Sequence, residues 1–203
     1  MIVFLNGTSS AGKTSIAKKI QEIYPEPMLH MGMDHFFFSL HPRFIGHGEE
    51  SHLGYQFVSV DDPIGPKILV QKGIYGKRIS RAMHLALKAV VESNIPLVID
   101  DLLFSEEDFQ DYLELFKDVN VIFVSVKPPL QIAELREKMR GDRSAGLARG
   151  LYEVVYQDRL FDIEIDTEKM SPEESAQLII NYINASTQPT AFKENALRAH
   201  LTR

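Results

Sequence analysis

The sequence predicts a three-layer α/β domain built on a parallel sheet of about five strands. An apolar run over residues 1–5, a glycine-rich loop and a helical pattern follow one another at the start of the chain, as they do around a phosphate-binding loop. Beyond them, strand-like and helix-like segments alternate along most of the 203 residues. This alternation implies parallel strands joined by right-handed crossovers, with helices on both faces of the sheet.

The glycine-rich loop fits the pattern G-x-x-x-x-G-K-[ST]. Its residues are Gly7, Thr8, Ser9, Ser10, Ala11, Gly12, Lys13 and Thr14. The two glycines allow the backbone to turn so that successive N–H groups face phosphate oxygens, next to the positive end of the following helix. Lys13 is expected to reach the β- and γ-phosphates of a nucleotide, and the Thr14 hydroxyl to coordinate Mg²⁺. An accidental glycine turn would not require a strand before it and a helix after it, so we expect nucleotide binding.

The remaining elements follow from apolar spacing and capping residues. Apolar side chains at helical spacing over residues 67–93 predict a helix that begins after Pro66. The valine-rich segment 119–126 is the plainest strand. We expect further strands at 28–31, 96–100 and 161–166, and further helices at 15–23, 105–117, 128–140 and 171–182.

Two regions interrupt this alternation. Residues 41–66 are rich in His, Gly and polar residues, and we expect an irregular insertion there, because a long loop in a compact domain is usually functional or disordered. Its histidines do not have the spacing of a standard zinc site. The tail at 185–203 is expected to be a C-terminal extension with a short helix, either flexible or packed. Residues 1–184 then form the main domain.

Composition excludes several classes of function. The net charge of −6 argues against a nucleic-acid partner, which needs a basic surface. The chain has no cysteine, so disulfides, thiol nucleophiles and cysteine-ligated metals are excluded. No apolar run approaches the roughly 20 residues of a membrane-spanning helix, and the first strand leaves no room for a signal peptide. We expect a cytoplasmic protein with no membrane partner, and the sequence leaves homo-oligomerisation open.

Two adjacent acids, Asp100 and Asp101, stand at the end of a predicted strand. Ligands of doubly wound sheets gather at the carboxyl ends of the strands, where an acid can hold Mg²⁺ opposite Thr14. Adjacent residues of a strand point to different sides, so we expect at least one of the two to serve the metal. The alternative is that they only cap the following turn.

Asp34 follows the strand at 28–31 and is expected on the same edge of the sheet as the phosphate-binding loop. A carboxylate there can accept the proton of an alcohol that attacks a γ-phosphate. The alternative role for Asp34 is that of a helix N-cap, because a run of three phenylalanines follows it closely. The neighbouring His35 is a lesser candidate.

A segment rich in arginine and glycine follows the strand at 119–126. Arg136 and Arg140 share a helix face, and glycine then separates them from Arg143. Glycines beside arginines suit a lid, at about 136–149, that closes over phosphates and supplies positive charge. We assign Arg140 and Arg143 to catalysis and Arg136 to nucleotide binding. The alternative is a set of ordinary surface arginines paired with Glu134 or Glu137.

With these pieces in place, the chain resembles the chloramphenicol phosphotransferase-like family of P-loop kinases. The most specific signatures are Gly-x-Asp after the second strand and Arg-Gly-Asp-Arg-x-Ala-Gly in the lid segment. Residues 35–63, where the acceptor pocket is expected, and the tail after 185 have no match. The matching stretches keep the family's order and are residues 5–14, 25–27, 32–34, 64–66, 98–101, 140–146 and 161–167.

The resemblance implies a P-loop kinase domain over 1–184, with the architecture of nucleoside or shikimate kinases. It implies ATP- and Mg²⁺-dependent phosphorylation of a hydroxyl on a small molecule, with Asp34 as general base and the stretch after Asp166 near the adenine. Chloramphenicol is one candidate acceptor, and a different hydroxyl compound is another. Two alternatives stay open, a toxin-type kinase for another metabolite and a nucleotide-dependent switch.

Overall fold

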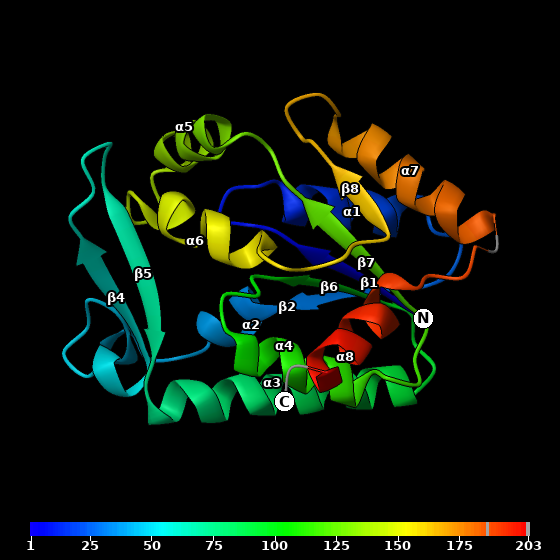
Figure 1. Cartoon of the computed structure of the whole chain (residues 1–203), viewed down its shortest axis with the longest axis horizontal. Helices are drawn as coiled ribbons and strands as arrows, with labels where there is room; N and C mark the ends of the chain where they lie inside the picture. Colours follow the sequence, from blue (N-terminus) through cyan, green and yellow to red (C-terminus); the bar gives the residue numbers. More distant parts are fainter. Residues whose placement is uncertain (186, 202–203) are drawn as a thin grey trace.

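A computed structural model of the chain describes residues 1–185 and 187–201. At its centre lies a five-stranded sheet with the strand order β2-β6-β1-β7-β8 (Figure 1). Every neighbouring pair in it is parallel, which confirms the predicted fold class. The strands are β1 (Ile2–Asn6), β2 (Leu29–Gly32), β6 (Leu97–Asp101), β7 (Val121–Val126) and β8 (Ile163–Ile165).

Helices cover both faces of this sheet. Helices α1 (Lys13–Ile23) and α7 (Pro172–Asn184) pack on one face, and α3 (Ile74–Glu92), α4 (Glu106–Leu115) and α8 (Ala191–Leu201) on the other (Figure 1). Val3 and Leu5 of the central strand face the first layer, whereas Ile2 and Phe4 face the second. A strand buried on both faces needs such a continuous apolar run. Among the described residues, no helix combines the length and hydropathy needed to cross a membrane.

Three further helices follow the carboxyl ends of the strands. Helix α2 (Met33–Phe37) directly follows β2, and α5 (Leu130–Arg140) and α6 (Leu147–Tyr156) follow β7. Only the first residues of α6, up to Arg149, lie within the lid expected at about 136–149. These helices lie at the edge of the sheet where ligands of doubly wound folds gather.

The expectation of an irregular insertion at 41–66 is wrong. The region supplies two strands, β3 (Ile45–Gly46) and β4 (Tyr55–Val60), and two short 3₁₀ helices at 42–44 and 51–53. Together with β5 (Lys67–Lys72) the two strands form a second, three-stranded sheet. The helix predicted to begin after Pro66 therefore begins only at Ile74. Residues 67–72 become a strand because they pair antiparallel with β4, and this tertiary pairing outweighs their helical spacing.

The antiparallel ribbon of β4 and β5 is attached to helix α6 (Figure 1). The Ile68 N–H donates to the Gly146 carbonyl at 2.9 Å. The side chain of Ile68 is buried in an apolar cluster with Leu147, Leu151 and Val155. The ribbon thereby forms a wall beside the arginine segment.

The C-terminal tail packs on the main sheet. Helix α8 has 11 residues, and Phe192 near its start is only 4% exposed. The Phe192 ring contacts the rings of Phe4, Phe109 and Phe123, with centroid distances of 6.3, 6.4 and 5.7 Å. The tail thus supplies part of the core under the central strands.

Replacing Phe192 by Ala is expected to lower the free energy of unfolding by about 3 kcal/mol or more, because it leaves a cavity among three aromatic rings. Urea denaturation measures the change. Leu197→Ala is the matched control, since Leu197 lies on the same helix and is 65% exposed. It should shift stability by less than about 0.5 kcal/mol. Equal losses in the two variants would contradict the packing of α8.

Candidate active site

The glycine-rich loop joins the central strand β1 to helix α1. Gly12 has φ 101°, a left-handed conformation that favours glycine, and it is the N-cap residue of α1. The Lys13 side chain folds back over the loop, and its Nζ donates to the carbonyls of Gly7 and Thr8 at 2.9 and 3.1 Å. The loop therefore holds a cation beside the open N-terminus of a helix, an arrangement that binds phosphate.

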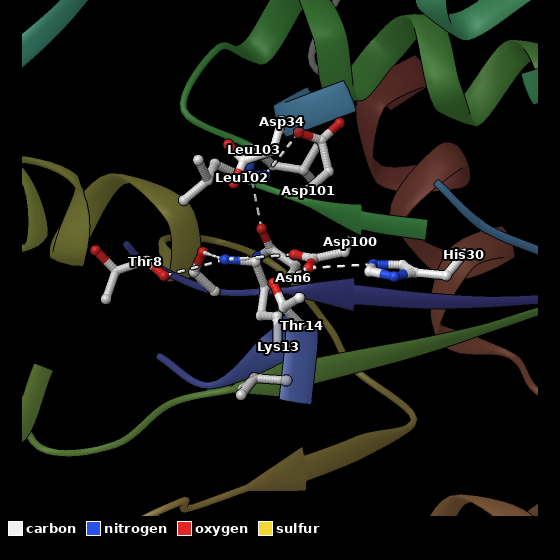
Figure 2. A network of polar contacts seen from close by, with 12 residues as sticks. Asn6, Thr8, Lys13, Thr14, His30, Asp34, Asp100, Asp101, Leu102 and Leu103 are labelled. Carbon is white, nitrogen blue, oxygen red and sulfur yellow. Dashed lines mark hydrogen bonds and ion pairs between the residues drawn. The ribbon is translucent and has the colours of Figure 1, made fainter. Parts of the chain in front are cut away.

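Asp100 connects this loop to the neighbouring strand β6 (Figure 2). The Thr14 hydroxyl donates to its Oδ2 at 2.6 Å, and Lys13 Nζ lies 3.7 Å from its Oδ1. His30 Nε2 lies 3.4 Å from the same Oδ2 atom. Burial raises the pKa of Asp100, but the charge of Lys13 and the hydrogen bonds of His30 and Thr14 outweigh it and hold the pKa below its usual value.

Asp101 points to the other side of the strand, as expected for adjacent strand residues (Figure 2). Its Oδ2 accepts from the Tyr112 hydroxyl at 2.6 Å, and its Oδ1 accepts from the Leu102 N–H at 2.7 Å. Burial raises the pKa of Asp101, although both hydrogen bonds oppose this. Asp100 is therefore the one of the two acids that faces the phosphate-binding loop.

Asp34 reaches the same edge of the sheet from β2. A Cβ on Gly32 would lie 1.8 Å from the Asp100 carbonyl oxygen, so only glycine allows β2 and β6 to approach this closely. This explains the glycine of the Gly-x-Asp signature. Gly32 is also the N-cap residue of α2, so Asp34 does not take the capping role considered above. Asp34 Oδ2 instead accepts from Arg143 Nη2 at 2.6 Å.

The three arginines have different partners. Arg136 donates from Nη1 to the Thr167 hydroxyl and from Nη2 to the Thr167 carbonyl, both at 2.7 Å, and the Thr167 hydroxyl donates to the Ala11 carbonyl at 2.8 Å. Arg136 thus ties the phosphate-binding loop to the segment after β8. Arg140 pairs with Asp142 on the surface at 3.0 Å, and Arg143 pairs with Asp34.

Glu137 is a residue whose structural role sequence reasoning missed. It is only 4% exposed, and its two carboxylate oxygens accept from the N–H groups of Gly146 and Ala148 at 2.8 and 2.7 Å. Burial raises its pKa despite these hydrogen bonds. Glu137 closes the loop that carries Arg143, whereas its neighbour Glu134 pairs with Arg149 at 2.6 Å.

Helix α6 supports the phosphate-binding loop from behind. The Thr8 hydroxyl donates to the Ala148 carbonyl at 2.8 Å, and the Thr8 N–H donates to the Tyr156 hydroxyl at 3.1 Å. The Asn6 side chain bonds both the Val155 carbonyl and the Leu103 N–H. The contacts with α6 join residues 140 to 149 positions apart, so no local signal in the sequence could have indicated them.

A cleft of about 490 Å³ gathers most of the expected site residues. Gly7 and Thr8, on the supported side of the loop, and Asp101 lie outside its lining. The Ser10 Oγ atom is shielded from solvent and has no hydrogen-bond partner among the described residues, as expected for a group that awaits a ligand. The expected site residues that line the cleft are Ser9, Ser10, Ala11, Gly12, Lys13, Thr14, Asp34, Asp100, Arg136, Arg140 and Arg143.

The family model of chloramphenicol phosphotransferase-like proteins matches residues 1–184. The chain belongs to this family. Two relatives in Mycobacterium tuberculosis carry the provisional name O-phosphotransferase, and each is 30% identical over 201 residues, or 97% of this chain and 87% of the relative. Membership confirms the identification from sequence and places this chloramphenicol phosphotransferase-like protein among P-loop kinases, which bind nucleotides.

Solved structures share the fold of this family member. The APS kinase of M. tuberculosis, in complex with AMPPNP and APS, superposes with a TM-score of 0.59 at 16% identity and covers 90% of this chain and 96% of its own. Shikimate kinase from Acinetobacter baumannii, in complex with shikimate, gives a TM-score of 0.57 at 15% identity, with 92% and 94% covered. At these identities the likeness concerns the fold alone, and it confirms the kinase architecture expected from sequence.

The two strand-end acids predict opposite effects of pH on stability. The folded pKa of Asp100 lies below its unfolded value of about 3.9. Its ionised form therefore stabilises the fold above that pH, and this contribution is lost as the pH falls through the folded pKa. The folded pKa of Asp101 lies above the unfolded value, so its contribution is present at low pH and is lost as the pH rises through the folded pKa.

Urea denaturation of the wild type, Asp100→Asn and Asp101→Asn across acidic and neutral pH tests this prediction. On acidification, the stability advantage of the wild type over Asp100→Asn should shrink. Its advantage over Asp101→Asn should grow instead. Parallel pH profiles for the two variants would show that the two carboxylates do not differ in this way.

Proposed function

We propose that the protein transfers the γ-phosphoryl group of ATP, with Mg²⁺, to a hydroxyl of a small molecule. One observation carries the proposal. Asp34, a carboxylate from the end of β2, lines the same cleft as the phosphate-binding loop with Lys13, Thr14 and Asp100. An acid at this position has a role in alcohol phosphorylation, whereas a nucleotide-dependent switch would not need it.

The phosphates of ATP lie along the loop and the N-terminus of α1. Backbone N–H groups of the loop and Lys13 Nζ bind their oxygens, and the unpartnered Ser10 hydroxyl donates a further hydrogen bond. Arg140 and Arg143, which also line the cleft, offset the charge that develops on the transferring group. Arg136 acts by holding the loop to Thr167.

The residues fit a magnesium ion beside the phosphates. The Thr14 hydroxyl and the Asp100 carboxylate present oxygen donors 2.6 Å apart at the edge of the cleft, and Mg²⁺ prefers oxygen ligands of this kind. Thr14 and Asp100 would hold Mg²⁺ there, and the ion would supply positive charge that offsets the charge of the phosphates. Asp101 has no part in this site, because its carboxylate is directed to Tyr112.

The transfer follows an in-line displacement. The acceptor hydroxyl gives its proton to the Asp34 carboxylate, and its oxygen forms a bond to the γ-phosphorus as the bond to the bridging oxygen of ADP breaks. Arg143 orients Asp34 through their 2.6 Å hydrogen bond. The loop between Gly141 and Gly146 then acts as the lid, and both glycines have positive φ angles.

The proposal predicts different losses in two variants. Lys13→Ala should abolish transfer by removing the cation at the phosphates. Asp34→Asn should retain ATP binding but lower kcat by about 10²- to 10⁴-fold, because it removes the proton acceptor. Mass spectrometry of reactions with ATP, Mg²⁺ and a panel of alcohols that includes chloramphenicol measures transfer, and calorimetry measures ATP binding.

Asp118→Asn provides the control, because Asp118 is exposed and follows α4, away from the cleft. It should transfer phosphate at the wild-type rate. If Asp34→Asn also does so, Asp34 is not the base. If the wild type binds ATP but phosphorylates no alcohol of the panel, the kinase assignment fails in favour of a nucleotide-dependent switch.

A further inference from the structure

A second, smaller cavity opens beside Asp34 and Arg143, on the side away from the phosphate-binding loop. Both residues line this cavity as well as the main cleft. Its walls are apolar and come from α2, the β4–β5 ribbon, the segment after β6 and helix α6. The side chains that form most of them are Phe37, Phe57, Val70, Leu102, Phe104 and Leu151.

The charges at the mouth of this cavity are already paired. Asp34 and Arg143 are hydrogen-bonded at 2.6 Å, and the guanidinium of Arg143 also lies over the Phe38 ring at 5.1 Å. Among the described lining residues, this leaves no free cation for a carboxylate or phosphate on the acceptor. An ionised group buried without a partner costs several kcal/mol or more. The cavity therefore disfavours anionic acceptors.

One buried polar atom in this pair has no partner in the described part of the chain. The Arg143 Nε atom is shielded from solvent and has no hydrogen-bond partner among the described residues. This buried donor next to the carboxylate of Asp34 suits the reacting oxygen of an acceptor. The apolar walls that the described residues form offer no partner for a second polar group.

The cavity is also small. Its volume is about 40 Å³, whereas an apolar cavity of about 150 Å³ holds one benzene ring. Phe57 limits the space, because it stacks on Phe37 at a centroid distance of 6.3 Å and pairs across the ribbon with Val70. The space suits a group of one to about three carbon atoms and excludes an aromatic ring.

We propose that this cavity is the apolar subsite for the acceptor, and that the acceptor is an uncharged alcohol with a compact aliphatic group beside its reacting hydroxyl. The proposal rests on the proposed function, because it places the hydroxyl at Asp34. Phe57 and Val70 of the ribbon determine the size of the group that enters.

Three alcohols test the charge and size limits with the full chain, ATP and Mg²⁺. Isobutanol is the compact uncharged probe, 3-hydroxyisobutyrate carries a carboxylate in place of one of its methyl groups, and benzyl alcohol carries a ring. The ratio of kcat/KM values, from product formation followed by mass spectrometry, is the readout. The wild type should prefer isobutanol over each of the other two by about tenfold or more, since 1.4 kcal/mol corresponds to tenfold.

Enlarging the cavity should shift the substrate preference toward the alcohol that carries a ring. Phe57→Ala is expected to raise the ratio for benzyl alcohol over isobutanol by about tenfold or more, and Val70→Ala should shift it in the same direction by less. If loss of the Phe57 ring unfolds the ribbon, the Val70 variant still tests the size limit of the cavity. Phe44→Ala is the control, because Phe44 lies in the same small sheet region but packs on Tyr75 outside the cavity.

Two failures are distinguishable. If the wild type binds ATP but phosphorylates none of the three probes and no alcohol of the wider panel, both the proposed function and the subsite proposal are wrong. The subsite proposal is wrong, and the kinase assignment holds, if the wild type prefers the anionic or the aromatic probe. The same conclusion follows if neither ribbon variant changes the ratio of kcat/KM values more than Phe44→Ala does.

Discussion

The arrangement of the site depends on the hydrogen bonds and charges around Asp100. This carboxylate joins strand β6 to Thr14 and Lys13 of the phosphate-binding loop and to His30 of β2. Its backbone carbonyl packs so closely on Gly32 that no side chain fits there. Three neighbouring strands thus end at fixed relative positions, and the distance between the phosphate-binding loop and Asp34 is set by the sheet rather than by loops.

Helix α6 supports the phosphate-binding loop from the side opposite to Asp100. Tyr156, Ala148 and Val155 bond the loop and the end of β1, while the start of the helix is bound by Glu137. A carboxylate at a helix N-terminus offsets the partial positive charge of the unpaired N–H groups. One short helix therefore fixes the phosphate-binding loop and the loop that carries Arg143 together.

The sequence was sufficient wherever a feature is local. The strand, loop and helix around Lys13 are contiguous, and Asp34 and Asp100 could be placed at one edge because parallel strands end together. The sequence was insufficient where contacts are distant. Residues 67–72 continue the apolar spacing of the helix that follows, and only pairing with Tyr55–Val60 makes them a strand. Likewise, Glu137 resembles a surface acid until the turn at Gly141 brings back the N–H groups of Gly146 and Ala148.

The attachment of the ribbon to helix α6 has a consequence for how specificity can evolve. A Cβ on Gly150 would lie 1.8 Å from the Ile68 carbonyl oxygen, so β5 and α6 touch through their backbones. The ribbon is consequently not an exchangeable module. A ribbon with a different backbone path past Gly150 would displace α6 and, with it, the phosphate-binding loop that α6 supports. With the acceptor subsite proposed above, single substitutions within the ribbon are the changes that would alter the acceptor without displacing α6.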